Sequence, residues 1–181
     1  MKKLLFVSIT LFMQLLIAGC QSTSNPSTKN PSIRLKPALS VALQEVDGIK
    51  KYKAGKYKEA FELLKTPATW GYKGAQYAIA FMFLKGQHVQ QSTLLGMGWL
   101  GVATEAKTSE WFEQYQSFYN AASADEKLKI DKIVAKYIRR YGMKAQHITC
   151  RRSKNRGVLS FKQKCYKSDK LSTIYEIDLV E

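Results

Sequence analysis

Apolar and polar residues recur along most of this chain with the period of an α-helix. Between about residues 40 and 107, small and apolar side chains return every three or four positions, and turns at Gly55, Gly71 and Gly86 separate the runs. The third helix of this region is predicted over 91–106. Helices of this length cannot bury their apolar faces alone, so we expect them to stack on one another.

Two more helices are predicted beyond this region. The first begins at about Ser109, and its aromatic stripe is expected to pack on the preceding helices, with an exposed binding face as the alternative. The stripe comprises Trp111, Phe112, Tyr115, Phe118, Tyr119 and Ala122. Ser123 followed by Asp125 and Glu126 is typical of a helix start, and Gly142 of a helix end.

The period changes from helical to alternating after Gly142. Residues 147–150 and 158–165 are predicted as two strands around a loop over 153–157, and 173–180 as a third strand. The predicted fold is therefore mainly α. A helical repeat domain over 38–142 precedes a small basic element over 143–181, which forms a β-hairpin or a three-stranded sheet.

The N-terminal segment has the pattern of an export signal. Lys2 and Lys3 precede an uncharged apolar stretch, which is shorter than the roughly 20 residues of a spanning helix. The stretch ends in Ile17-Ala18-Gly19-Cys20, which resembles the lipobox of bacterial lipoproteins. An ordinary secretory signal with a chance cysteine is the alternative.

The lipobox resemblance implies a location. Residues 1–19 would be removed, and Cys20 would be acylated and hold the chain on a membrane. Gln21 after the cysteine favours, by analogy with lipoprotein sorting, the periplasmic face of the outer membrane. Residues 20–37 have almost no large apolar side chains and are expected to form a flexible tether.

Two cysteines remain beyond Cys20. In an exported chain, Cys150 and Cys165 are expected to form a disulfide that closes the hairpin. A metal site that also used His147 would lack a fourth ligand, so we expect no metal.

Part of the helical region resembles the Sel-one-like repeat, a relative of the tetratricopeptide repeat. The resemblance covers about 70 residues, or one and a half to two copies, and rests on Gly74-Ala75-Gln76-Tyr77, Ile79-Ala80, Met82-Phe83, Gly86, Val89, Gln91, Trp99 and Ala103. It implies a solenoid of short helix pairs that holds a protein partner without catalysis. The residues expected on the partner-binding face are Tyr57, Tyr77, Phe81, Phe83 and Trp99. All of them could equally be packing residues.

The charge distribution raises a second hypothesis. The net charge is +15, and 126–170 hold 15 Lys and Arg against three acidic residues. An exported protein meets lipopolysaccharide, anionic lipid or cell-wall glycan before nucleic acid, so we expect no nucleic-acid partner. The alternative function is therefore polyanion binding by Lys132, Lys136, Arg139, Arg140, Arg151 and Arg152. A charged helix face that only meets solvent would have the same pattern.

Motifs of catalysis are weak in this chain. The run Gly96-Met97-Gly98-Trp99-Leu100-Gly101 has the letters of a dinucleotide fingerprint, but no strand precedes it, and close helix packing explains its glycines better. Neither histidine, His88 or His147, has an evident acid and nucleophile nearby in the sequence. We therefore expect no enzyme activity and no cofactor. The leading hypothesis is a lipid-anchored scaffold for another, unidentified envelope protein.

Overall fold

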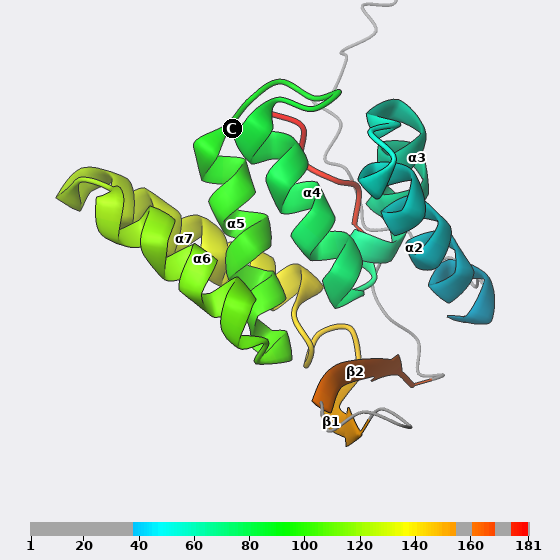
Figure 1. Ribbon diagram of the computed structural model, residues 1–181. Coiled ribbons are helices and arrows are strands. Elements are labelled where there is room, and N and C mark those ends of the chain that lie inside the picture. Colours follow the sequence, from blue (N-terminus) through cyan, green and yellow to red (C-terminus); the bar gives the residue numbers. More distant parts are fainter. Residues whose placement is uncertain (1–37, 155–160, 169–174, 181) are drawn as a thin grey trace, which may run out of the picture. The chain divides into compact units, whose positions relative to one another are not determined.

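The computed structural model describes residues 38–154, 161–168 and 175–180 (Figure 1). The described residues form six α-helices, one short 3-10 helix and a two-stranded antiparallel sheet. In chain order they are α2 (Ala38–Lys53), α3 (Tyr57–Thr69), α4 (Lys73–Lys85), α5 (Thr93–Ala103), η1 (Thr104–Ala106), α6 (Ser109–Ala121), α7 (Ala124–Tyr141), β1 (Ile148–Lys154) and β2 (Phe161–Lys167). The mainly helical class with a small hairpin is confirmed.

The predictions for the N-terminal segment, Cys20 and the tether lie outside the described residues. Within the part of the chain that the structure describes, no helix combines the length and the hydropathy needed to cross a membrane.

The helices pack mainly in consecutive pairs. α2 packs on α3 and α4 on α5, α3 joins the two pairs through α4, and α7 packs along α5 (Figure 1). α5 is the centre of this arrangement, because every residue from Leu95 to Ala103 is buried. Trp99 lies within it with no exposed surface and stacks on Tyr141, with 4.7 Å between the ring centroids.

Capping residues determine where the helices begin and end. The predicted start of α7 is confirmed by a capping box, in which Ser123 and Glu126 each bond the other's backbone N–H. Ser92 accepts a hydrogen bond from the N–H of Leu95 (3.0 Å), so α5 begins at Thr93 and not at residue 91 as predicted. At the other end, Gly86 closes α4 in the left-handed conformation (φ 65°).

The glycines of α5 permit its close packing. A Cβ added at Gly96 would lie 2.6 Å from Leu84 of α4, and one added at Gly101 would lie 2.5 Å from Cγ2 of Val134 on α7. The interpretation that these glycines serve close helix packing is confirmed by the position of the run inside a buried helix.

The C-terminal third contains the expected disulfide. Cys150 on β1 pairs with Cys165 on β2 in the antiparallel register, and their sulfur atoms are bonded. The third strand was predicted over 173–180, and its described part, 175–180, is not a strand. This segment packs on α7 instead, where Tyr141 Oη donates to the carbonyl of Glu176 (3.2 Å).

Lys167 attaches the hairpin to the helices. Its amino group donates to the carbonyls of Gln146 (2.6 Å) and Trp70 (3.3 Å), and lies 5.4 Å from the centre of the Trp70 ring. Burial lowers the pKa of Lys167 to about 8. The neutral amine still has two N–H groups for these two carbonyls.

The substitution Gly101→Ala tests the contact between α5 and α7. Alanine favours a helix by up to about 1 kcal/mol over glycine, but the clash with the stiff Val134 side chain should outweigh this gain. We expect a net loss of about 1–3 kcal/mol in the free energy of unfolding. In urea unfolding, Val134→Ala should destabilise the Gly101→Ala protein much less than it destabilises wild type, because it removes the clashing methyl groups. A Gly101→Ala protein more stable than wild type would contradict the close approach.

The substitution Lys167→Met tests the attachment of the hairpin through its pH dependence. In the unfolded chain the lysine pKa is about 10.4, so between about pH 8 and pH 10 the unfolded chain binds a proton that the folded chain lacks. The stability of wild type relative to Lys167→Met should therefore rise with pH in this window, as measured by urea unfolding of both proteins. A flat or falling difference would show that the amine is not buried.

Candidate protein-interaction surface

A buried polar network at the start of α4 sets the geometry of the region. The Lys73 side chain is 2% exposed, and its ammonium donates to Gln76 Oε1 (2.9 Å), the carbonyl of Val102 (3.0 Å) and Glu105 Oε2 (2.8 Å). Burial lowers the pKa of Lys73, and the Glu105 carboxylate opposes this shift. Glu105 also accepts the backbone N–H of Met143 (2.9 Å).

This network donates hydrogen bonds to backbone carbonyls near the ends of three helices. The amide of Gln76 donates to the carbonyls of Ala68 (3.0 Å) near the end of α3 and of Tyr141 (2.9 Å) at the end of α7. Val102, bonded by Lys73, lies near the end of α5. Helix ends leave their last carbonyls without helical partners and carry partial negative charge, which a buried lysine complements. Because the three ammonium hydrogens of Lys73 are all used, this lysine has a structural role.

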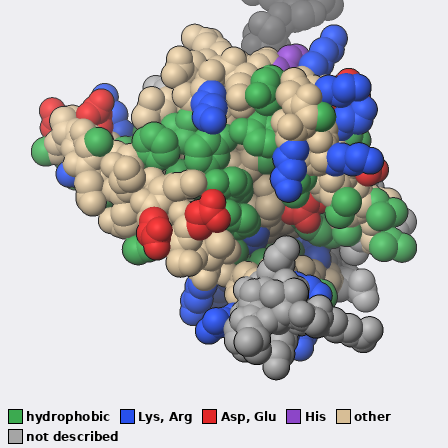
Figure 2. All heavy atoms as spheres, in the orientation of Figure 1, with side chains coloured by type: hydrophobic (Ala, Val, Ile, Leu, Met, Phe, Trp, Pro, Cys, Tyr) green, Lys and Arg blue, Asp and Glu red, His purple; other side chains and the backbone are tan. Residues whose placement is uncertain are grey.

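Half-exposed aromatic rings cover the neighbouring face, across α4 and α6. The Tyr77 ring stacks on Trp111 with 4.6 Å between centroids, and the Tyr77 hydroxyl donates to Gln114 Oε1 (2.7 Å). Phe81, one turn further along α4, meets Phe118 of α6 at 6.5 Å. Figure 2 shows hydrophobic side chains gathered over the α4–α6 part of the molecule.

Two tyrosines extend this face towards α2. Tyr52 on α2 contacts Tyr57 at the start of α3, with 5.6 Å between the ring centroids. Burial raises the pKa of the Tyr52 hydroxyl, and the nearby Tyr57 and Tyr77 hydroxyls raise it further. We define the aromatic surface as these six residues: Tyr52, Tyr57, Tyr77, Phe81, Trp111 and Phe118.

The structure divides the predicted partner-binding residues into two groups. Tyr57, Tyr77 and Phe81 are half-buried members of the aromatic surface. Phe83 and Trp99 have no exposed surface, so the prediction that they lie on a binding face needs correction. Their side chains point into the core between the helices, and a partner has no access to them.

Trp111 and Phe118 were not among the residues expected on a partner-binding face, although an exposed face was the alternative for the stripe that contains them. The sequence shows them in the aromatic stripe of α6, seven residues apart and therefore on one face of the helix. The expectation that this stripe packs against the preceding helices holds only in part, because no residue of α6 is fully buried. Phe112 and Phe118 are 53% and 42% exposed.

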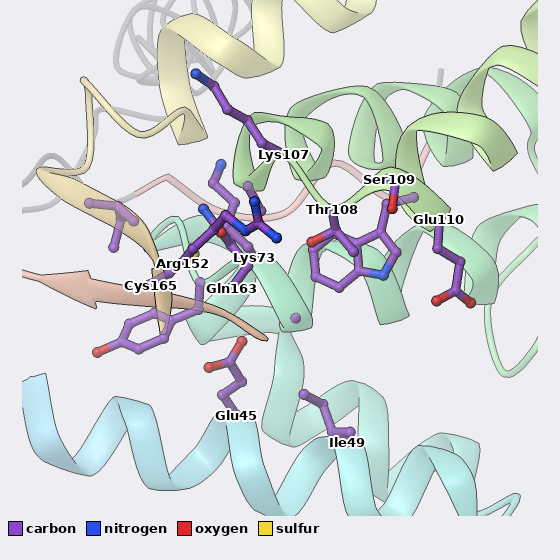
Figure 3. A pocket seen from close by; sticks show the side chains of 15 residues that line it. Glu45, Ile49, Lys73, Lys107, Thr108, Ser109, Glu110, Arg152, Gln163 and Cys165 are labelled. Carbon is purple, nitrogen blue, oxygen red and sulfur yellow. The ribbon is translucent and has the colours of Figure 1, made fainter. Parts of the chain in front are cut away.

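A pocket of about 780 Å³ adjoins the aromatic surface and shares Trp111 with it. In Figure 3, Glu45 and Ile49 enter from α2, Arg152 and Gln163 from the hairpin, and Thr108 and Glu110 from the start of α6. The pocket therefore combines charges of both signs with apolar side chains. Glu45 also accepts the backbone N–H of Ala75 (3.0 Å), which caps α4.

The predicted polyanion-binding residues lie on two elements. Lys132, Lys136, Arg139 and Arg140 belong to α7, and Arg151 and Arg152 belong to β1. On α7, the chain's own Asp178 is 2.8 Å from the Lys136 amino group and 3.8 Å from the Arg140 guanidinium. Arg151 lies over the Tyr166 ring, and Arg152 borders the pocket. A polyanion on α7 would therefore compete with the carboxylate of Asp178.

The two histidines lie in separate connecting segments. His88 follows α4 and contacts the Phe61 ring edge-on at 5.8 Å, and His147 precedes β1. Among the described residues, no group of His, Cys, Asp and Glu side chains is arranged to hold a metal ion.

The substitution Lys73→Met tests the buried network. Removing the ammonium leaves Gln76, the Val102 carbonyl and part of Glu105 buried without their donor, so the free energy of unfolding should fall by about 3 kcal/mol. The double variant with Glu105→Gln removes the uncompensated charge and should recover part of this loss in urea unfolding. If Lys73→Met alone left stability unchanged, the ammonium would have to be solvated.

Comparisons of the chain with protein-family models, with curated proteins and with solved structures found no match in any of the three. The function proposed for the aromatic surface therefore depends on its residues and their geometry.

Proposed function

We propose that this chain is a non-catalytic lipoprotein, attached through acylated Cys20 to the periplasmic face of the outer membrane, where it binds another envelope protein. The aromatic surface carries this proposal. Its large aromatic rings come from α2, α3, α4 and α6, and they remain partly exposed. Aromatic residues with a polar group dominate the energetics of protein interfaces.

The compartment is supported by two independent features. The N-terminal residues have the charge, length and small residues of a lipoprotein signal ending at Cys20. The Cys150–Cys165 disulfide is the form that cysteines take in an oxidising compartment outside the cytosol.

The arrangement of the helices supports a repeat architecture. The α2–α3 and α4–α5 pairs have similar lengths and pack on each other, as the resemblance to Sel-one-like repeats implies. In such a stack, neighbouring helices present a continuous face, and α2, α4 and α6 together supply five of the six residues of the aromatic surface. The finer assignment to a repeat solenoid is part of this proposal.

The surface indicates the chemistry of its partner. Apolar side chains of a partner segment would pack on Tyr77, Phe81 and Phe118, and Lys85, whose amino group lies 5.4 Å from the Phe81 ring centre, borders this patch. The adjoining pocket can hold a polar end of the same segment, because Arg152 and Glu110 offer opposite charges. We therefore propose an apolar or aromatic segment with polar flanks as the bound element.

Polyanion binding by the basic C-terminal third remains the alternative proposal. Its six residues are split between α7 and β1, and Asp178 already neutralises part of the α7 set. This makes the aromatic surface the better supported site. The two functions differ in salt dependence, because exposed charges are screened within about 10 Å at 0.1 M salt.

Phe118 and Phe112 provide a matched test. Both are exposed phenylalanines of α6, but Phe118 contacts Phe81 of the aromatic surface. Phe112 instead lines a hollow that α5, α6 and α7 form and that contains no residue of the aromatic surface. A photoreactive amino acid at position 118 should crosslink a specific envelope protein in vivo, and one at position 112 should not. With that partner purified, Phe118→Ser should weaken binding by roughly tenfold or more, and Phe112→Ser by much less.

The same binding assay separates the alternatives. If added salt abolished binding while Phe118→Ser had no effect, the basic third and not the aromatic surface would be the site. Equal crosslinking from positions 112 and 118 would also count against a defined surface. Thermal unfolding of both serine variants serves as the control for folding.

A further inference from the structure

The first described helix has an exposed apolar stripe that the helix packing does not explain. Leu39, Leu43 and Val46 are 72%, 56% and 62% exposed, and their spacing places them on one face of α2. The opposite face of α2 carries Val41 and Gly48, which are buried against the other helices. Figure 2 shows a separate group of hydrophobic side chains at the right edge of the view, where α2 lies in Figure 1.

Lysines continue the same stripe. Lys50 and Lys53 follow Val46 at intervals of four and three residues, so they lie on the outward face at the end of α2. Both are exposed, and neither takes part in an ion pair found among the described residues. The outward face of α2 is thus apolar for two turns and cationic in its last turns.

This pattern matches a lipid surface. Helices that lie in the membrane interface insert apolar side chains at the headgroup boundary and place lysines at the phosphates. Long lysine side chains can extend their amino groups towards the headgroups while their stems lie on apolar groups. Anionic lipids attract such cations.

The position of α2 in the chain favours lipid over other occupants. Only 17 residues separate Cys20 from Ala38, and they span at most about 60 Å when fully extended. Of the described elements, α2 is therefore the one held closest along the chain to a lipid on Cys20. A second copy of this chain fits less well as the occupant. Stable interfaces bury about 800 Å² on each partner, and the area of three side chains is far smaller.

We propose that the outward face of α2 lies on the membrane surface, with Leu39, Leu43 and Val46 at the headgroup boundary and Lys50 and Lys53 at lipid phosphates. This inference rests on the proposed attachment through Cys20. It leaves the aromatic surface open, since Tyr52 and Ile49 are on another side of α2. The bilayer contact would then fix how that surface faces the periplasm.

Crosslinking to lipid tests the contact. The full mature chain is purified with its lipid and reconstituted in vesicles of phosphatidylethanolamine and phosphatidylglycerol, with a photoreactive amino acid at Leu43 or, as the control, at Leu128. Leu128 is also an exposed leucine, at 60%, but lies on α7. Phospholipid adducts at position 43 should exceed those at position 128 by roughly tenfold, because only the former would be held in the interface.

A second variant tests the stripe itself. Leu39→Ser with Val46→Ser should lower lipid adducts at position 43 by roughly tenfold, because most of the apolar area is removed from the contact. Both side chains are exposed, so the thermal unfolding midpoint should stay unchanged. Adducts with a second copy of the chain, or with residues 21–37, in place of lipid would overturn the proposal, as would equal lipid adducts at positions 43 and 128.

A separate measurement tests the proposed attachment through Cys20. Intact mass of the purified chain shows whether Cys20 carries acyl groups. If it does not, the chain is attached at residue 20 to a nickel-chelating lipid through a histidine tag, and crosslinking from Leu43 is repeated. Lipid adducts under those conditions would support the α2 contact although the proposed attachment had failed, and their absence would overturn both.

Discussion

The convergence of three helix ends on the first turn of α4 is the constraint on which the helical part depends. The last carbonyls of α3, α5 and α7 meet in a region closed to water, where an unpaired carbonyl would cost much of the stability of a small domain. Gln76 and Lys73 donate to one carbonyl near each of these helix ends, and Glu105 balances the buried charge. The Ala68 carbonyl also accepts the backbone N–H of Gly71. Once these bonds form, the ends of α3, α4, α5 and α7 are fixed at one point.

α6 is held differently from the other helices. It has no fully buried residue and takes no part in the polar network, so its position depends on side chains at its surface. Trp111 stacks on Tyr77, Gln114 accepts the Tyr77 hydroxyl, and Tyr115 closes on Gly101 of α5. Two of the contacts that place α6, those of Trp111 and Gln114 with Tyr77, therefore also build the aromatic surface. A partner bound there would also stabilise the position of α6, since ligand binding favours the state that binds it.

The sequence predicts elements better than it predicts which side chains are accessible. Periodicity and capping chemistry place the helices to within a few residues, because Ser123, Gly86 and Gly142 act through local backbone bonds. Helical spacing places Phe81 and Phe83 on opposite sides of α4, so both could not lie on the one binding face that the resemblance implied. Because α4 is apolar on nearly every side, the spacing alone could not indicate which of the two is exposed. Lys73 looks like a surface lysine in the sequence. Its burial depends on three carbonyls brought together only by the tertiary fold.

The two exposed apolar regions differ in a way that indicates different partners. On the aromatic surface, rings are half-buried, pack on one another and carry polar groups, such as the Tyr77 hydroxyl bonded to Gln114. Such preformed, rigid groups suit the specific and directional contacts of a protein interface. On α2, the aliphatic side chains of Leu39, Leu43 and Val46 are more than half exposed, and exposed lysines follow them. A fluid lipid surface needs no shape complementarity, so a short aliphatic stripe bordered by cations is sufficient to bind it. The same stripe offers few directional contacts to a protein partner.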